Sequence, residues 1–135
     1  MSEEYILTLN REQAALLSRA CEFYSRVRNG QFHEIVWELS LNEHKYAAAN
    51  FDWDLVDALL SAARKPIFPN LSMSPGHHYG VNHDHDSDVA WDTHEVIRHA
   101  IAYHDNPEGG EGVYFREPMN WSGLPLPKIQ VKEES

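Results

Sequence analysis

The sequence is poor in cysteine and in basic side chains, and it lacks any long apolar run. Cys21 is the single cysteine among 135 residues, so no intrachain disulfide supports the fold and a reducing compartment is expected. Lysine and arginine number 11 against 21 aspartates and glutamates, a formal net charge of −10. Nucleic acids and anionic membranes are bound through cationic surfaces, which argues against both as general partners. No apolar stretch approaches the roughly 20 residues of a membrane span, so a cytoplasmic protein is expected.

Length and apolar spacing predict the class of fold. A chain of this size is expected to form one domain, residues 1–135, with an apolar fraction of 42% that is ordinary for globular proteins. The apolar residues recur mostly with helical spacing. We therefore expect a mainly α domain of four to five helices. A minor β element of two or three strands is expected from residues 5–9, 113–115 and 129–131.

Local signals predict where the helices begin and end. Asn10 and Gln13 form a capping-box pattern, so a helix is expected to start at Arg11, and Gly30 is a good stop signal. Asp52 can cap a later helix that carries Leu55, Leu59 and Ala62, and Pro66 is expected to end it. The other expected helices cover residues 31–41, 43–50 and 87–104, the last of them capped by Asp86 or Ser87. Between and after the helices lie a long loop, residues 66–86, and a Gly/Pro-rich segment, residues 107–135.

The helix expected at 87–104 carries a regular polar stripe. Asp88, Asp92, Glu95 and His99 follow the spacing i, i+4, i+7 and i+11, which places them on one side of a helix. Carboxylates and an imidazole one turn apart could hold Mg²⁺ or Mn²⁺ and activate a water for phosphate-ester hydrolysis. The competing interpretation is an acidic face in water, with Glu95 paired to His99.

Histidines gather in the preceding loop, at positions 77, 78, 83 and 85. His83 and His85 have a spacing found among zinc ligands. We expect a histidine-rich surface loop rather than a zinc site, because the residues that follow do not complete a known ligand pattern.

Basic and aromatic residues suggest a different site. Arg26 lies near the Gly30 turn and Arg98 lies on the later helix, and a guanidinium binds phosphate or carboxylate in a bidentate fashion. Trp91 and Tyr79 could provide the stacking platform for a nucleobase. The alternatives are a solvated ion-pair ladder and aromatic residues of the core.

Tryptophans are more numerous than one small core easily absorbs. Trp37, Trp53 and Trp121 are therefore candidates for an exposed interface. Homodimerisation is the default expectation for such a chain.

Two segments resemble a family. EFYSRVRNGQFHEI (residues 22–35) and AWDTHEVIRHAIAYHDNPEGGEG (residues 90–112), with the pair Tyr79-Gly80, resemble small uncharacterised proteins of tailed phages and prophages. The matching residues are Arg26, Gly30, Gln31, Glu34, Arg98 and His99. The family usually carries Tyr-Gln where this chain has His94-Glu95, which puts the metal stripe in doubt. The resemblance implies an accessory protein in the host cytoplasm that acts by binding, in some cases against host defence.

These observations favour a non-enzymatic binding protein that sequesters a small anionic, nucleotide-like ligand without a cofactor. Its hypothetical ligand-binding residues are Arg26, Gln31, Glu34, Tyr79, Trp91, Arg98 and His99. One alternative is an inhibitor of a host protein that acts by direct contact. The other is a metal-dependent phosphohydrolase that uses Asp88, Asp92, Glu95 and His99 with Mg²⁺ or Mn²⁺.

Overall fold

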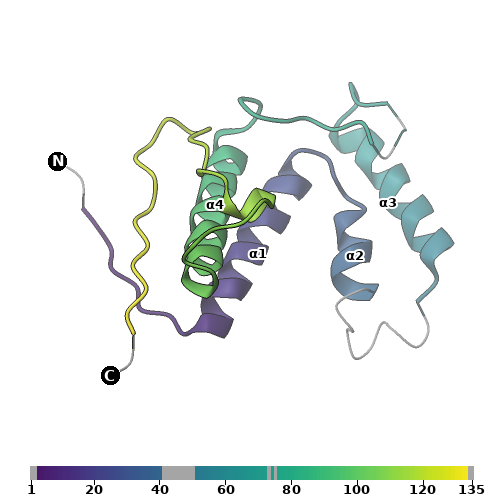
Figure 1. Cartoon of the computed structure of the whole chain (residues 1–135). Coiled ribbons are helices and arrows are strands. Elements are labelled where there is room, and N and C mark those ends of the chain that lie inside the picture. The colour runs from purple at the N-terminus through teal and green to yellow at the C-terminus, as the bar shows by residue number, and fades with distance from the viewer. Residues whose placement is uncertain (1–2, 41–50, 73, 75, 134–135) are drawn as a thin grey trace. The chain divides into compact units, whose positions relative to one another are not determined.

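The computed structural model describes residues 3–40, 51–72, 74 and 76–133, and it is mainly helical (Figure 1). The elements are the helices α1 (Arg11–Arg28), α2 (Glu34–Ser40), α3 (Trp53–Ile67) and α4 (His85–Asp105) and the short 3-10 helix η1 (Val113–Phe115). The mainly α class is therefore confirmed. The helix expected at 43–50 lies outside the described residues. None of the helices described is both long and apolar enough to cross a membrane.

The expected β element is wrong for the residues that the structure describes, which include no strand. Residues 113–115 form η1, in which the amide of Phe115 donates to the carbonyl of Gly112 over 3.1 Å. Residues 5–9 and 129–131 have no regular secondary structure. β-branched and aromatic residues favour strands only where a neighbouring strand offers them a pleated surface to pack on, and no strand among the described residues borders these segments.

Helix ends follow the local signals closely. The amide of Asn10 donates to Gln13 Oε1 over 3.0 Å and the amide of Gln13 donates to Asn10 Oδ1 over 2.8 Å, which is the expected capping box. Asp52 caps α3 by accepting from the amide of Leu55. Gly30 follows α1 with a positive φ of 92°, and a Cβ there would lie 2.7 Å from Leu71 Cδ1, so glycine is required.

Three expected boundaries are wrong. Helix α2, expected from residue 31, starts at Glu34. Helix α4 starts at His85 because Asp84, rather than Asp86 or Ser87, accepts from the amide of Ser87 over 2.9 Å. Pro66 does not end α3, which continues to Ile67. The helix ends one residue after the proline, which has no N–H to donate to the carbonyl of Ala62 four residues before it.

The residues fall into two compact units. The terminal unit contains residues 1–22 and 89–135, and the central unit contains residues 23–88. Both α1 and α4 contribute one part to each unit.

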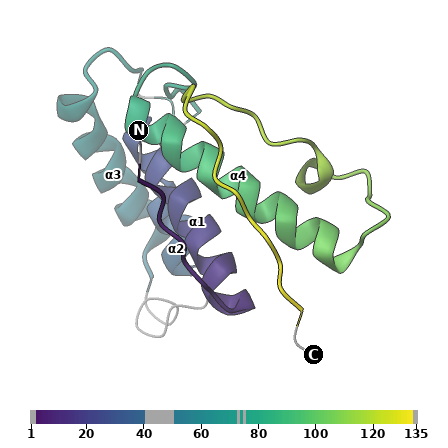
Figure 2. The same cartoon turned by 90° about the vertical axis from the view of Figure 1, so that its left-hand side faces the viewer.

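In the terminal unit the first part of α1 lies beside α4 (Figures 1 and 2). Ser18 Oγ donates to the carbonyl of His94 over 2.9 Å, and Arg11 pairs with Asp105. Val96 and Ile97 on α4 are its buried apolar residues. Figure 2 shows the C-terminal segment running along α4.

In the central unit α2 lies beside α3 (Figure 1). Val36 and Leu71 are its buried apolar residues, and the rings of Phe32 and Phe68 meet edge to face at 5.8 Å. Ser25 Oγ lies 2.7 Å from Ser87 Oγ, which joins the end of α1 to the start of α4.

Candidate functional site

The first two acids of the α4 stripe are buried rather than solvated. Asp88 is 3% exposed and Asp92 is 2% exposed, so the interpretation of a face in water is wrong. Asp92 accepts from two successive backbone amides, that of Trp121 over 2.8 Å and that of Ser122 over 3.0 Å. The carboxylate therefore holds the C-terminal segment against α4.

Neighbouring members of the stripe also have partners within the protein. Glu95 accepts from the amide of Met119 over 3.3 Å and pairs with Arg98 over 3.5 Å, not with His99 as expected. Asp88 accepts from the amide of Asn82 over 3.1 Å, and His99 Nε2 lies 4.0 Å from Glu117. Across the described ranges no group of three His, Cys, Asp or Glu side chains is placed to hold a metal ion. Three of the four stripe residues, Asp88, Asp92 and Glu95, thus accept from backbone amides, and His99 lies beside a carboxylate.

Histidines of the long loop also have local roles. The amide of Ser72 donates to His77 Nδ1 over 2.9 Å. The ring of His83 stacks on Tyr79, with centroids 3.6 Å apart and planes 5° from parallel. This stack occupies one face of the tyrosine that was expected to receive a ligand.

Three of the predicted ligand residues come together in the central unit. Arg26 Nη1 donates to Gln31 Oε1 over 3.0 Å and lies 3.9 Å from Glu34 Oε1. The cluster joins the end of α1 to the start of α2. Because a carboxylate already faces the guanidinium, its charge is largely balanced within the protein.

The other basic residue of the predicted site, Arg98, lies in the terminal unit. Its guanidinium pairs with Glu95 and lies 4.9 Å over the ring of Tyr114. Trp91 stacks on Trp121, with centroids 5.3 Å apart and planes 7° from parallel. The predicted site draws Arg26, Gln31, Glu34 and Tyr79 from the central unit and Trp91, Arg98 and His99 from the terminal unit.

Arg64 is a structural residue that the sequence analysis missed. It is 5% exposed and its guanidinium donates to four backbone carbonyls. The acceptors are His77 at 2.7 Å, Ser74 at 2.8 Å, Gly30 at 3.4 Å and Ser72. The residue joins α3 to the turn after α1 and to the 66–86 loop. The sequence pattern that could have identified this role is an arginine in the last turn of a helix, just before a loop rich in Ser, Pro and Gly.

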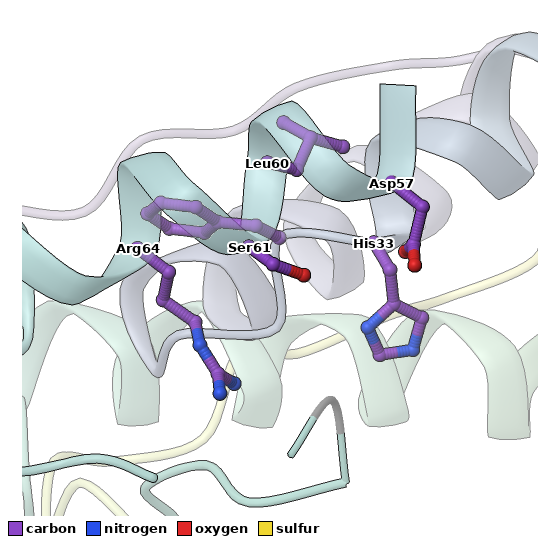
Figure 3. Close-up of a pocket in the computed structure, with 6 residues that line it drawn as sticks. His33, Asp57, Leu60, Ser61 and Arg64 are labelled. Carbon is purple, nitrogen blue, oxygen red and sulfur yellow. The ribbon is translucent and has the colours of Figure 1, made fainter. Parts of the chain in front are cut away.

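A small hollow lies beside Arg64 (Figure 3). Its volume is about 220 Å³ with open solvent included, and it is lined by Phe32, His33, Asp57, Leu60, Ser61 and Arg64. Figure 3 shows that Asp57, Leu60, Ser61 and Arg64 come from one helix, α3. Small-molecule sites usually measure about 300–1,000 Å³, so this hollow is too small to enclose a nucleotide.

The outward face of α3 is apolar. Leu55 is 55% exposed and Leu59 is 60% exposed, and Ala58, Ala62 and Ala63 are exposed beside them. Leu55, Leu59 and Ala62, which have helical spacing in the sequence, are therefore all exposed on this helix. The buried residue of this helix is Arg64, because the loop carbonyls around that position need a hydrogen-bond donor and a leucine supplies none.

Cys21 has the properties of a packing residue. It is a half-buried free thiol on α1, and burial raises its pKa. A raised pKa keeps the thiol protonated and poorly nucleophilic at neutral pH.

A charge pair at the start of α4 predicts acid sensitivity. Arg28 Nη2 donates to Asp84 Oδ1 over 2.8 Å, and this hydrogen-bonded guanidinium lowers the pKa of Asp84 to about 2. The lowered pKa favours folding above the ordinary value of 3.8, and this contribution disappears as the pH falls toward about 2. We expect Asp84→Asn to lower the Tm at neutral pH and to leave a flatter Tm profile between about pH 4 and pH 2. Calorimetry across that range measures both effects, with exposed Asp86→Asn as the matched control. Parallel profiles for the protein and Asp84→Asn would show that the pair does not contribute.

Comparison with protein-family models, with curated proteins and with solved structures finds no match for this chain.

Proposed function

We propose that the chain is a non-enzymatic binding protein that acts through direct contact with another protein. The observation that supports this proposal is the outward apolar face of α3, formed by Leu55, Leu59 and the adjacent alanines. A partner that covers the exposed half of either leucine would gain roughly 1 kcal/mol from that side chain. Contiguous exposed apolar residues on one helix are typical of interaction surfaces.

The class of partner is proposed from the resemblance to small phage proteins. An accessory protein of that kind, made in the host cytoplasm, would inhibit a host protein, which includes a component of host defence. The surface of α3 is the part of the central unit that we assign to this contact.

Ligand sequestration is the second candidate function. The contacts of Arg26 with Gln31 and Glu34 support it, because they bring three of the proposed ligand residues together, although Glu34 also balances part of the guanidinium charge. If it is correct, one member of a panel of mono-, di- and cyclic nucleotides raises the Tm of the protein, and Arg26→Ala abolishes that shift. Arg19→Ala, on an exposed part of the same helix, is the control. A panel without any Tm shift, or a shift that Arg26→Ala retains, would remove this candidate.

Site-specific photocrosslinking tests the protein-contact proposal. We expect a benzoylphenylalanine in place of Leu59 to give a discrete protein adduct in the cells that express the chain. The same probe in place of Leu124, which is also exposed, is expected to give none. The variant that carries both the probe at position 59 and Leu55→Glu should give no adduct, because covering a carboxylate with an apolar partner is unfavourable.

Three other outcomes would change the interpretation. Adducts of equal yield at positions 59 and 124 indicate non-specific contact and contradict the proposal. An adduct of twice the chain's mass identifies a second copy and supports the expected homodimer in place of a host partner. If neither the probe at position 59 nor the probe at position 124 gives an adduct, α3 contacts no partner in those cells, which also contradicts the proposal.

A further inference from the structure

The outward face of α3 has a defined shape and length. Leu55, Leu59 and Ala62 lie along one line of the helix, with Ala58 and Ala63 on either side. Small residues beside two leucines let another backbone approach closely. The helix has 15 residues, which corresponds to about 22 Å at 1.5 Å per residue. A partner helix of about four turns would match this length.

The charges at the N-terminal end of this face are negative. Asp52 at the N-cap and Asp54 in the first turn are exposed, whereas Asp57 lies on the opposite side of the helix, where it lines the hollow beside Arg64. The basic residues of α3 are both used within the protein. Arg64 is buried against loop carbonyls, and Lys65 Nζ donates to the carbonyls of Pro69 at 2.8 Å and Leu71 at 3.3 Å. The N-terminal half of the apolar stripe therefore lies beside two acids, and both basic residues of α3 lie in its last turn.

We propose that the face binds an amphipathic helix of the partner whose apolar stripe is flanked by lysine or arginine. This inference rests on the proposed function and specifies the chemistry of the partner. Apolar contact with Leu55 and Leu59 provides affinity, while basic side chains opposite Asp52 and Asp54 provide orientation and faster association. A second copy of this chain fits less well, because it brings the same acids and a further net charge of −10.

A peptide-display selection tests the proposal directly. The library contains helices of about 15 residues, the length of α3, with leucine or alanine on one face and every other position varied among Lys, Glu and Gln. The intact protein serves as the target and its Leu59→Glu variant serves as the decoy. We expect the selected peptides to be enriched in lysine beside the apolar face. Synthetic copies should bind the protein at least about tenfold more tightly than copies with glutamate at those positions, and raised salt should reduce the difference.

Matched variants separate specific binding from general attraction to an acidic protein. Leu59→Glu makes the protein more acidic, so a non-specific basic peptide would bind it more tightly, whereas a peptide seated on α3 should lose about tenfold or more in affinity. Leu124→Glu adds the same charge to an exposed leucine far away in the sequence and should leave affinity unchanged. Circular dichroism of both variants verifies that each one is folded.

Each other outcome contradicts the proposal in a distinguishable way. Selection of glutamate-rich or uncharged helices overturns the charge assignment and leaves the protein-contact function standing. If peptides are enriched equally on the protein and on the Leu59→Glu decoy, or are not enriched at all, the face binds no amphipathic helix. The photocrosslink at position 59 then decides whether it contacts a protein at all. Sedimentation that shows a dimer, lost in Leu59→Glu, identifies a second copy as the occupant.

Discussion

Arg64→Met is expected to lower the free energy of unfolding by about 3–5 kcal/mol, the largest loss that we expect from any single substitution in this chain. The guanidinium is buried and donates to the carbonyls of Gly30, Ser72, Ser74 and His77. Methionine keeps most of the aliphatic stem but leaves these acceptors without their donor. Loss of a charged hydrogen-bond donor costs more than loss of a neutral one, and the four acceptors lie on segments that Arg64 holds together.

Chemical denaturation and thermal unfolding measure this loss. Arg64→Lys retains the charge but replaces a planar fork by one ammonium, so we expect an intermediate loss. Lys65→Met is the matched control on the neighbouring, exposed position and should cost below about 1 kcal/mol. If Arg64→Met and Lys65→Met have similar stabilities, Arg64 does not organise the loop.

Asp92→Ala is expected to cost about 2–4 kcal/mol and to release the C-terminal segment from α4. The carboxylate is 2% exposed and accepts from the amides of Trp121 and Ser122, which would lose a charged acceptor. Asp92→Asn has nearly the same shape, but one of its two oxygens becomes an amide nitrogen that cannot accept from an N–H. We expect that variant to lose roughly half as much stability.

The stacked rings of Trp91 and Trp121 report on this release. Near-ultraviolet circular dichroism should weaken in Asp92→Ala at temperatures where the helices remain folded. Asp86→Asn, exposed on the first turn of α4, is the control and should change neither the spectrum nor the stability by more than about 0.5 kcal/mol. A stoichiometric Mg²⁺ or Mn²⁺ ion that stabilises the protein and not Asp92→Ala would instead support the metal-dependent alternative.

Helix boundaries were the part of this fold that the sequence predicted best. The capping box of Asn10 and Gln13, the cap at Asp52 and the stop at Gly30 all have the expected geometry. Each signal acts within about four residues, so the chemistry that decides it is present in the local sequence. At the start of α4, Asp84, Asp86 and Ser87 are all possible caps, and local rules alone did not identify Asp84 as the residue that caps the helix.

The environment of each helix face was predicted less well. The carboxylate of an aspartate such as Asp92 can be satisfied by water at the surface or by backbone amides in the interior. The sequence of its own helix does not distinguish these two environments. The deciding amide belongs to Trp121, 29 residues further along the chain. The same holds for α3, where an arginine faces inward because carbonyls from a distant loop require a donor.

Of the residues proposed to bind a ligand, those that are close in sequence contact one another. Arg26, Gln31 and Glu34 meet because a single turn connects α1 and α2. Arg98, in contrast, pairs with Glu95 and covers Tyr114, a contact that depends on how the segment after α4 folds back.

Composition and local pattern determined that this chain is acidic and mainly helical, and they set most of its helix ends, because these properties depend on residues within one or two turns. Tertiary structure decided which side of each helix is buried, since that depends on the hydrogen-bond donors and acceptors that distant segments bring. The buried acids of α4 and the exposed leucines of α3 both follow from this difference, and the proposed binding surface exists because of it.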